Sequence, residues 1–162
     1  MFNKKQLIAF EKRVAKLFLA KKIKVPIHLS GGNEDQLIKI FKDIRKGDYV
    51  FSTHRNHYHY LLHTGNSKGL LREIKGRDNG ICGGRSGSMH TIDHKNRFYS
   101  SGIVAGLVSV ACGVALGLKM NKSSQHVWCF VGDGACDSGY FVEALRYATF
   151  NDLPIKIGRA HV

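Results

Sequence analysis

The 162-residue sequence predicts an α/β domain in which helices flank a parallel sheet. Two apolar runs, a helical pattern between them and a glycine-rich turn after the first run together predict this fold class. A strand, a helix and a second strand within about 30 residues form a βαβ unit, and the strands of such a unit run parallel. The length fits one domain with its own hydrophobic core.

The βαβ unit occupies the last part of the chain. Residues 126–131 combine aromatic and β-branched side chains and are expected to form a buried strand that ends at Gly132. From Ser138 to Thr149 apolar side chains recur at helical spacing, and residues 153–155 begin the second strand. In open parallel sheets, ligands bind beyond the carboxyl ends of the strands, so the turn at Gly132 is a candidate binding position.

The start of the chain is expected to be a mature amphipathic helix. Its apolar positions are Leu7, Phe10, Val14, Leu17 and Phe18, which recur at helical spacing. The segment lacks the apolar core and cleavage site of a signal peptide, and Glu11 with the scarcity of serine and arginine argues against a mitochondrial transit peptide. A second helix is expected over residues 36–44 and a glycine-rich loop over residues 78–90.

The most apolar stretch, residues 98–118, carries no charged side chain. Its glycines and serines favour a buried helix of a soluble protein over a membrane-spanning helix. Ala105, Ser109, Gly113 and Gly117 stand four residues apart, so they would form one stripe that lets another helix approach closely.

Cysteine and charge content narrow the class of protein. Four cysteines without a Cys-x-x-Cys pair favour reduced thiols and a cytoplasmic protein. The net charge is +13, and residues 101–162 hold five basic and four acidic groups, so the basic excess lies in the first hundred residues. Such a surface attracts phosphate in a nucleic acid, a lipid or a small ligand, and a merely solvated basic surface is the alternative.

Asp133 lies between two glycines at the expected strand end. Its carboxylate can bind Mg²⁺, and the glycines let the backbone approach a diphosphate closely. A simple Asp-Gly turn is the alternative, because such turns are common where a strand ends.

Residues 52–63 hold four histidines around Arg55. Arginine suits a phosphate because its guanidinium group can bind two phosphate oxygens at once. A zinc site is disfavoured since no cysteine lies nearby, and a solvated polar loop stays open as an alternative. The loop over residues 83–90 offers hydroxyl, guanidinium and imidazole groups but lacks the Gly-Lys-Ser/Thr ending of a P-loop.

Five stretches together resemble the alpha subunit of the thiamine diphosphate-dependent first component of 2-oxo acid dehydrogenase complexes. That family includes pyruvate, acetoin and branched-chain enzymes. The stretches are IHLSGGNED at residues 27–35, STHRNH at 52–57, GRSGSMH at 84–90, SGIVAG at 101–106 and GDGACDSGYFVEAL at 132–145. They follow the order of the family, and the resemblance implies its thiamine diphosphate-binding fold, incomplete at the C-terminus.

The resemblance also implies roles for individual residues. Asp133 matches the magnesium ligand of the family, Arg55 matches the arginine that holds the diphosphate, and His54 stands where most members have tyrosine. His28 and His57 are the candidate catalytic residues. The implied cofactor-binding residues are His54, Arg55, Gly102, Val104, Asp133, Gly134 and Ala135.

The implied enzyme is an oxidoreductase that uses thiamine diphosphate and Mg²⁺. It would decarboxylate a 2-oxo acid such as pyruvate, or cleave acetoin, and pass the acyl group to a lipoyl carrier. The implied partners are the beta subunit, which contributes a glutamate to a shared active site in a heterotetramer, and the lipoyl-bearing acyltransferase. Neither a nucleic acid nor a membrane is expected as a partner.

Residues 1–156 are expected to be the N-terminal part of this domain, and residues 157–162 a non-native tail. The tail reads Ile-Gly-Arg-Ala-His-Val. A common sequencing-adapter sequence, ATCGGAAGAGCACACGTC, can encode these six residues. We therefore expect a fragment that lacks the second metal ligand and is inactive alone. Two alternatives stay open: the N-terminal part of another thiamine diphosphate enzyme, such as a transketolase, and a basic nucleic-acid-binding module.

Overall fold

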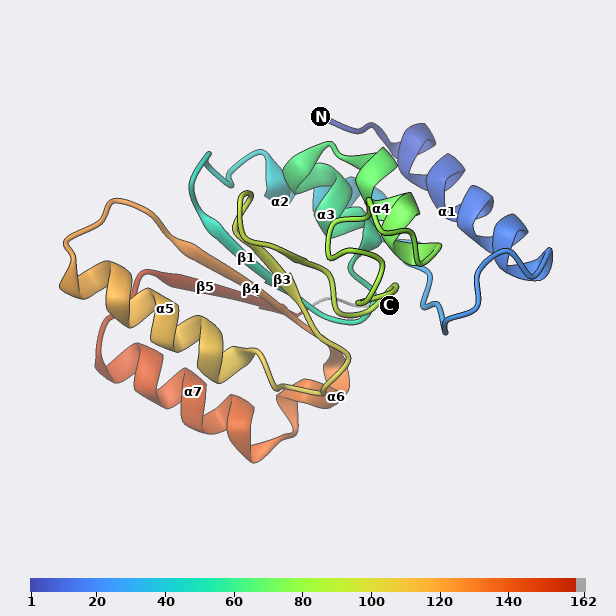
Figure 1. Ribbon diagram of the computed structural model, residues 1–162. Helices are drawn as coiled ribbons and strands as arrows, with labels where there is room; N and C mark the ends of the chain where they lie inside the picture. Colours follow the sequence, from blue (N-terminus) through green and yellow to red (C-terminus); the bar gives the residue numbers. More distant parts are fainter. Residues whose placement is uncertain (160–162) are drawn as a thin grey trace.

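The computed structural model describes residues 1–159, in which a five-stranded sheet lies between two groups of helices (Figure 1). In chain order the elements are α1 (Lys4–Leu19), α2 (Glu34–Phe41), β1 (Tyr49–Ser52), α3 (His57–Thr64), α4 (Ser67–Ile74), β2 (Ile92–Asp93), β3 (Phe98–Ser100), α5 (Val108–Met120), β4 (Val127–Val131), α6 (Asp133–Cys136), α7 (Gly139–Phe150) and β5 (Ile155–Arg159). Helices α1 to α4 cover one face of the sheet, and α5 and α7 cover the other.

The strand order is β2-β3-β1-β4-β5, and only β2 runs antiparallel to its neighbour. Val127 of β4 pairs with Ile155 of β5 in a parallel register, so β4, α7 and β5 form the expected βαβ unit. The predicted α/β fold with a mostly parallel sheet is confirmed.

Strand β4 is buried along its whole length because helices cover both of its faces. Trp128 and Phe130 join the core beneath α1 to α4, whereas Val127, Cys129 and Val131 join the core beneath α5 and α7. The unbroken apolar run in the sequence is the consequence of this two-sided burial.

Helix α1 forms where the sequence predicts it. Asn3 caps its start, since the Asn3 side chain accepts from the backbone N–H of Gln6 and the Gln6 side chain accepts from the backbone N–H of Asn3. The buried residues Leu7, Phe10 and Val14 face the core, as predicted. Phe18, which was expected in the same stripe, is 42% exposed at the end of the helix.

The expectation of one helix over residues 98–118 is wrong in its first half. Phe98–Ser100 forms β3, which pairs in parallel with β1, and α5 begins only at Val108. A short strand buried between two helix layers is as apolar as a buried helix, so hydrophobicity alone does not show where the strand ends and the helix begins.

The expected stripe of small residues is not the packing face of α5. Ser109 and Gly113 are exposed, and Ala105 lies before the helix with a φ of 57°. The helix packs instead through a second set of small residues, which are buried between α5, α7 and the sheet. They are Ala111, Cys112 and Ala115.

The histidine-rich segment is a solvated loop in neither of its parts: residues 53–56 form a loop in which His54 and Arg55 are half-buried, and the rest is helical. His57–Thr64 forms α3, in which His57 and His59 are buried. The helix expected over residues 36–44 is the shorter α2, Glu34–Phe41.

The last strand, β5, includes residues 157–159, whereas residues 160–162 lie outside the described residues. The division into a domain over residues 1–156 and a non-native tail over residues 157–162 therefore stays a prediction. Within residues 1–159, no helix combines the length and the hydropathy needed to cross a membrane.

Candidate functional site

Two adjoining cavities open at the carboxyl ends of β1 and β4. The larger has a volume of about 330 Å³ and is lined by the segment around Ser30, by Arg55 and His59, and by Asp133. The smaller, of about 150 Å³, lies between the two strand ends and the segment that leads into α5. Thr53, His54, Gly132 and Asp133 line both cavities.

The cavities bring together every residue that the sequence predicted to bind a cofactor. Arg55 lines the larger cavity, and the other predicted residues line the smaller one or both. The residues that line the smaller cavity are His54, Gly102, Val104, Asp133, Gly134 and Ala135. Because β1 and β4 are parallel neighbours, the loops after them meet at one edge of the sheet.

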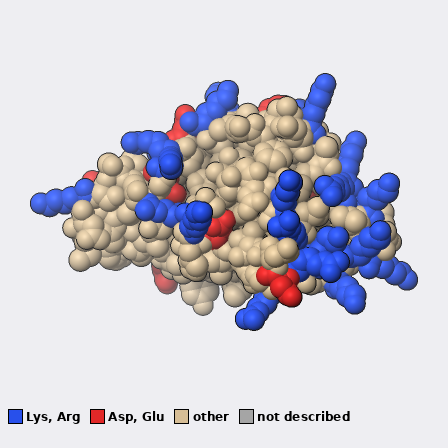
Figure 2. All heavy atoms as spheres, turned by 45° about the horizontal axis from the view of Figure 1, so that its top comes forward, with Lys and Arg blue, Asp and Glu red and all other residues tan. Residues whose placement is uncertain are grey.

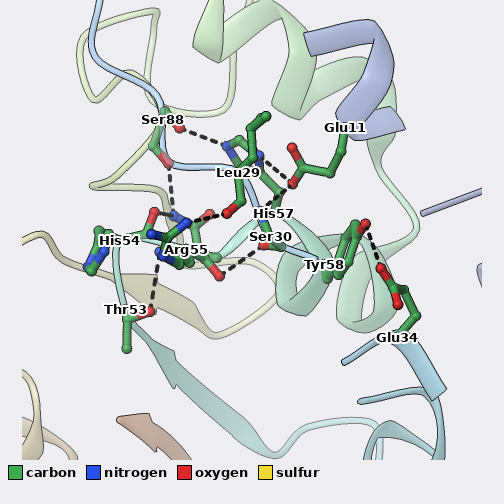
Figure 3. Close-up of polar contacts among 11 residues, drawn as sticks. Glu11, Leu29, Ser30, Glu34, Thr53, His54, Arg55, His57, Tyr58 and Ser88 are labelled. Atoms are coloured by element: carbon green, nitrogen blue, oxygen red, sulfur yellow. Dashed lines mark hydrogen bonds and ion pairs between the residues drawn. The ribbon is translucent and has the colours of Figure 1, made fainter. Parts of the chain in front are cut away.

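Arg55 is held by contacts to the segment before α2 (Figure 3). Its Nη1 donates to the carbonyl oxygen of Leu29 at 2.6 Å, and its backbone carbonyl accepts from Ser30 Oγ at 3.2 Å. Its backbone N–H donates to Thr53 Oγ1 at 3.2 Å. The guanidinium group has five N–H donors, so this arrangement leaves donors for an anion in the cavity.

Asp133 opens α6 directly after β4. Its side chain is exposed, and Oδ1 accepts from the backbone N–H of Gly134 at 2.9 Å. A Cβ atom built on Gly132 or Gly134 would meet no heavy atom within 4 Å, so open space lies beside the backbone on both sides of Asp133. A ligand as bulky as a diphosphate can therefore approach the backbone here.

Asp133 alone cannot make a complete metal site. Among the described residues, no group of three His, Cys, Asp or Glu side chains converges on one position. Mg²⁺ commonly takes one or two carboxylates and completes its shell with phosphate oxygens and water, so this single carboxylate fits a magnesium ion bound together with a phosphate.

His54 and His28 form an edge-to-face pair with ring centroids 4.7 Å apart. Burial, together with the neighbouring His28 and Arg55, lowers the pKa of His54, so its imidazole is neutral at pH 7. His28 lines neither cavity, and its Nδ1 is buried without a hydrogen-bond partner among the described residues. The buried, unsatisfied Nδ1 of His28 therefore belongs to a ring that packs against His54, a residue lining both cavities.

His57, the other candidate catalytic residue, does not reach either cavity. It is fully buried between Glu11 and Ser88, and each ring nitrogen has a hydrogen-bond partner. The structure thus separates His57 from the residues that line the cavities.

His59 lines the larger cavity and was not singled out from the sequence. Its ring stacks on Phe130 with centroids 4.4 Å apart, and its Nδ1 lies 2.6 Å from Ser52 Oγ. Burial lowers the pKa of His59 to about 3, so His59 is an uncharged lining residue of the cavity at pH 7. The only signal in the sequence was its place among three other histidines.

Lysine and arginine side chains gather on the side of the molecule where Figure 1 places α1 (Figure 2). Within residues 1–159, only Lys4 among them forms an ion pair with a carboxylate, that of Asp35. The basic excess of the first hundred residues is therefore mostly unpaired surface charge.

Comparison with known proteins gives consistent matches. The model of the family "Dehydrogenase E1 component" matches residues 3–159. The alpha subunit of acetoin:2,6-dichlorophenolindophenol oxidoreductase from Bacillus subtilis is 35% identical over 93% of this chain and 45% of its own length. The alpha subunit of the pyruvate dehydrogenase E1 component from Rickettsia prowazekii is 35% identical over 90% of this chain and 45% of its own length.

The chain therefore spans about half the length of these curated relatives. Among solved structures, a thiamin diphosphate-dependent enzyme from Mycobacterium smegmatis superposes with a TM-score of 0.50 at 16% identity. That match covers 85% of this chain and 23% of the solved chain, and it shows a shared fold.

Proposed function

Because the chain belongs to the dehydrogenase E1 component family, we propose that it is the N-terminal part of the alpha subunit of a thiamine diphosphate-dependent 2-oxo acid dehydrogenase. The substrate is a small 2-oxo acid such as pyruvate, or acetoin, since relatives of both kinds match at the same identity. Thiamine diphosphate supplies the carbanion chemistry that breaks the carbon–carbon bond.

The observation that carries this proposal is that Arg55 and Asp133 line one cavity. Arg55 offers a guanidinium group to the anionic diphosphate, and Asp133 offers a carboxylate to Mg²⁺. Gly134, Ala135, Gly102 and Val104 all line the smaller cavity. The first two, next to Asp133, would offer their backbone to the diphosphate, and the last two would lie beside the aminopyrimidine ring.

The side chains of this site would position the cofactor. His54 is neutral at pH 7, so it adds no positive charge to that of Arg55 in attracting the diphosphate. His28, with its unsatisfied Nδ1, is the histidine that we place nearest to the substrate. Orientation of this kind can contribute several kcal/mol to catalysis.

We propose that the alpha subunit works with a beta subunit, in a cytoplasmic heterotetramer that delivers its acyl group to a lipoyl-bearing acyltransferase. Large apolar side chains exposed on α5 and α7 support a further protein surface on that side of the sheet, contributed by the rest of the alpha subunit or by a partner. They are Val110, Met120, Tyr140, Val142, Leu145, Tyr147 and Phe150. Large apolar side chains gathered on one side of a soluble protein commonly mark an interface.

The proposal is tested by titrating the isotope-labelled chain with thiamine diphosphate in the presence of Mg²⁺ and following backbone amide signals by NMR. We expect weak binding, because the chain spans about half of its relatives. The signals that move should belong to residues lining the two cavities, with Thr53, His54 and Asp133 among them.

Thiamine without phosphate is the control, and it should move these signals much less. If thiamine diphosphate moves no signal near the cavities, or moves only surface signals of α1, the proposal is wrong. In the full-length alpha subunit assembled with its beta subunit, release of carbon dioxide from pyruvate would separate a pyruvate-type from an acetoin-type enzyme.

A further inference from the structure

Three polar side chains from distant parts of the chain form a buried hydrogen-bonded row (Figure 3). Glu11 Oε1 lies 2.9 Å from His57 Nδ1, and His57 Nε2 lies 2.7 Å from Ser88 Oγ. Glu11 is 5% exposed, His57 0% and Ser88 1%. A buried carboxylate and imidazole are costly unless both are hydrogen-bonded, so this row requires a structural reason or a functional one.

The row is connected to Arg55 through Ser30. The carboxylate oxygen of Glu11 that contacts His57 also accepts from the backbone N–H of Ser30 at 3.1 Å. Ser30 Oγ then donates to the backbone carbonyl of Arg55 at 3.2 Å, and the neighbouring carbonyl of Leu29 accepts from Arg55 Nη1 at 2.6 Å. Glu11 thus fixes the segment that holds both ends of Arg55.

The row is also connected to Arg55 through the chain that follows it. The hydroxyl group of Ser88 is hydrogen-bonded to the imidazole of His57, and the backbone carbonyl of Ser88 accepts from Asn56 Nδ2 at 2.8 Å. Two consecutive residues after Arg55 are therefore anchored to one serine in the glycine-rich loop. Arg55 consequently lies between two anchored segments, one before α2 and one at the start of α3.

We propose that Glu11 and His57 are positioning residues that orient the Arg55 guanidinium group for the diphosphate of the bound cofactor. The identity of that ligand rests on the proposed function, whereas the orientation of Arg55 does not. An arginine side chain that is free in solution has many rotamers, and holding it in one arrangement before the ligand arrives strengthens binding. His57 acts through Arg55 and not on the substrate, because it is buried and both of its ring nitrogens are used.

The test compares Glu11→Gln with Asp48→Asn. Each change replaces a buried carboxylate by an amide of nearly the same shape. Asp48 is 2% exposed and accepts from the backbone N–H groups of Arg45 and His126 and from Trp128 Nε1, all at the opposite edge of the sheet. Asp48 accepts through both of its oxygens, so Asp48→Asn should cost at least as much stability as Glu11→Gln and is the control for a loss of stability without a change near Arg55.

Two quantities are measured in each variant: the Kd for magnesium thiamine diphosphate, and the NMR signal of the Arg55 side-chain Nε–H in the ligand-free protein. Both contacts of Glu11 use Oε1, and Oε2 has no hydrogen-bond partner among the described residues, so Glu11→Gln can keep these contacts but removes the negative charge that strengthens them. It should raise the Kd about threefold to tenfold. Asp48→Asn should change the Kd less than about twofold and leave the Arg55 signal unmoved. In Glu11→Gln the Arg55 signal should shift or broaden.

Ser88→Ala is the second variant, in case Glu11→Gln does not fold. It removes the hydroxyl partner of His57 but keeps the carbonyl group that holds Asn56. A Kd about threefold higher, with a moved Arg55 signal, supports the proposal.

Three results would overturn the inference: an unchanged Kd in both Glu11→Gln and Ser88→Ala, an Arg55 signal that these changes do not move, or an equal loss of affinity in Asp48→Asn. If the unaltered chain binds no thiamine diphosphate, the proposed function fails. The Arg55 signal, which needs no ligand, still decides whether Glu11 positions the arginine.

Discussion

Arg55 and Asp133 line the same cavity, although Arg55 follows β1 and Asp133 follows β4. The two strands are adjacent and parallel, with Tyr49 opposite Val127, so their carboxyl ends fall at one edge of the sheet. A guanidinium group and a carboxylate that share a cavity without forming an ion pair offer separate binding positions to an anion and to a cation. This separation is what a magnesium diphosphate requires.

Replacing Asp133 by asparagine should abolish the magnesium-dependent part of diphosphate binding. The amide keeps the shape of the side chain but removes the negative charge that Mg²⁺ prefers. We expect the Kd for thiamine diphosphate to rise at least about tenfold when Mg²⁺ is present and to change little when EDTA is present. NMR or calorimetric titrations under the two conditions measure the difference.

Asp137→Asn is the control for this substitution, since Asp137 is an exposed carboxylate at the end of the same short helix. It lines neither cavity and should leave both dissociation constants unchanged. Equal effects of the two substitutions would mean that general charge, and not a ligand position at Asp133, governs binding.

Replacing Glu73 by glutamine should destabilise the fold by about 2 to 4 kcal/mol. Glu73 in α4 is fully buried, and its carboxylate organises the glycine-rich loop. It accepts from the backbone N–H groups of Cys82 at 2.7 Å and Gly84 at 2.9 Å, and from both the backbone N–H and Oγ of Ser86 at 2.8 Å. In glutamine, the NH₂ group would replace one of the two accepting oxygens and would face N–H or O–H donors that it cannot pair with. Urea unfolding at pH 7 measures the loss.

The loss should shrink at low pH. Burial opposes ionisation of Glu73, but the hydrogen bonds from Cys82, Ser86 and Gly84 outweigh it and hold the pKa of Glu73 below the usual 4.5. The stability that this carboxylate contributes is therefore present above pH 4.5 and is lost as the pH falls through the lowered pKa. Glu143→Gln, on the exposed face of α7, is the control. A loss that stays as large at pH 3 as at pH 7 would contradict this account.

The sequence was most informative where local pattern and tertiary packing agree. Strand β4 and helix α7 were predictable because one is a continuous apolar run and the other keeps a helical period between a serine cap and an Asn-Asp turn. Strand β3 was not predictable, because its three residues merge into the apolar stretch that continues into α5. Its pairing with β1, a long-range contact, and with β2 distinguishes it.

The residues of the candidate site also differ in how far the sequence could predict them. Arg55 and Asp133 could be proposed from residue type and from their places beside turns, since each group has a chemistry of its own. Glu11 could not, because in the sequence it is one charged residue of an amphipathic helix. Its burial depends on His57 and Ser30, which come from other segments and whose positions only the fold determines.

His59 should stay uncharged throughout the range from pH 7.5 to 4.5. Burial lowers the pKa of His59 to about 3, whereas the usual value is 6.5. Between these values the unfolded chain takes up a proton that the folded chain does not, so the stability falls as the pH drops below 6.5, by up to about 1.4 kcal/mol per pH unit. The carbon-bound proton signal of the His59 ring should not move in an NMR titration over that range. A midpoint above pH 5 would show that the ring is hydrated.

Two substitutions in α5 should have opposite effects on stability, because they lie on opposite faces of the helix. Ala115 is fully buried between α5, α7 and the sheet, so Ala115→Leu should overfill the core and cost about 1 to 3 kcal/mol. Gly113 is exposed, and a Cβ atom added to it would meet no heavy atom within 4 Å. Gly113→Ala should therefore stabilise the helix by about 1 kcal/mol.

Urea midpoints of the two variants and the unaltered chain measure both effects, and size-exclusion chromatography is run on the same samples. If Gly113→Ala lowers the midpoint while the chain stays monomeric, the exposed face of α5 is wrongly assigned. If it lowers the midpoint and also shifts the chain from a larger species to a monomer, another molecule packs closely against Gly113 in solution. The face of α5 with Ser109 and Gly113 would then be an interface, which is the close helix approach that the spacing of its small residues predicts.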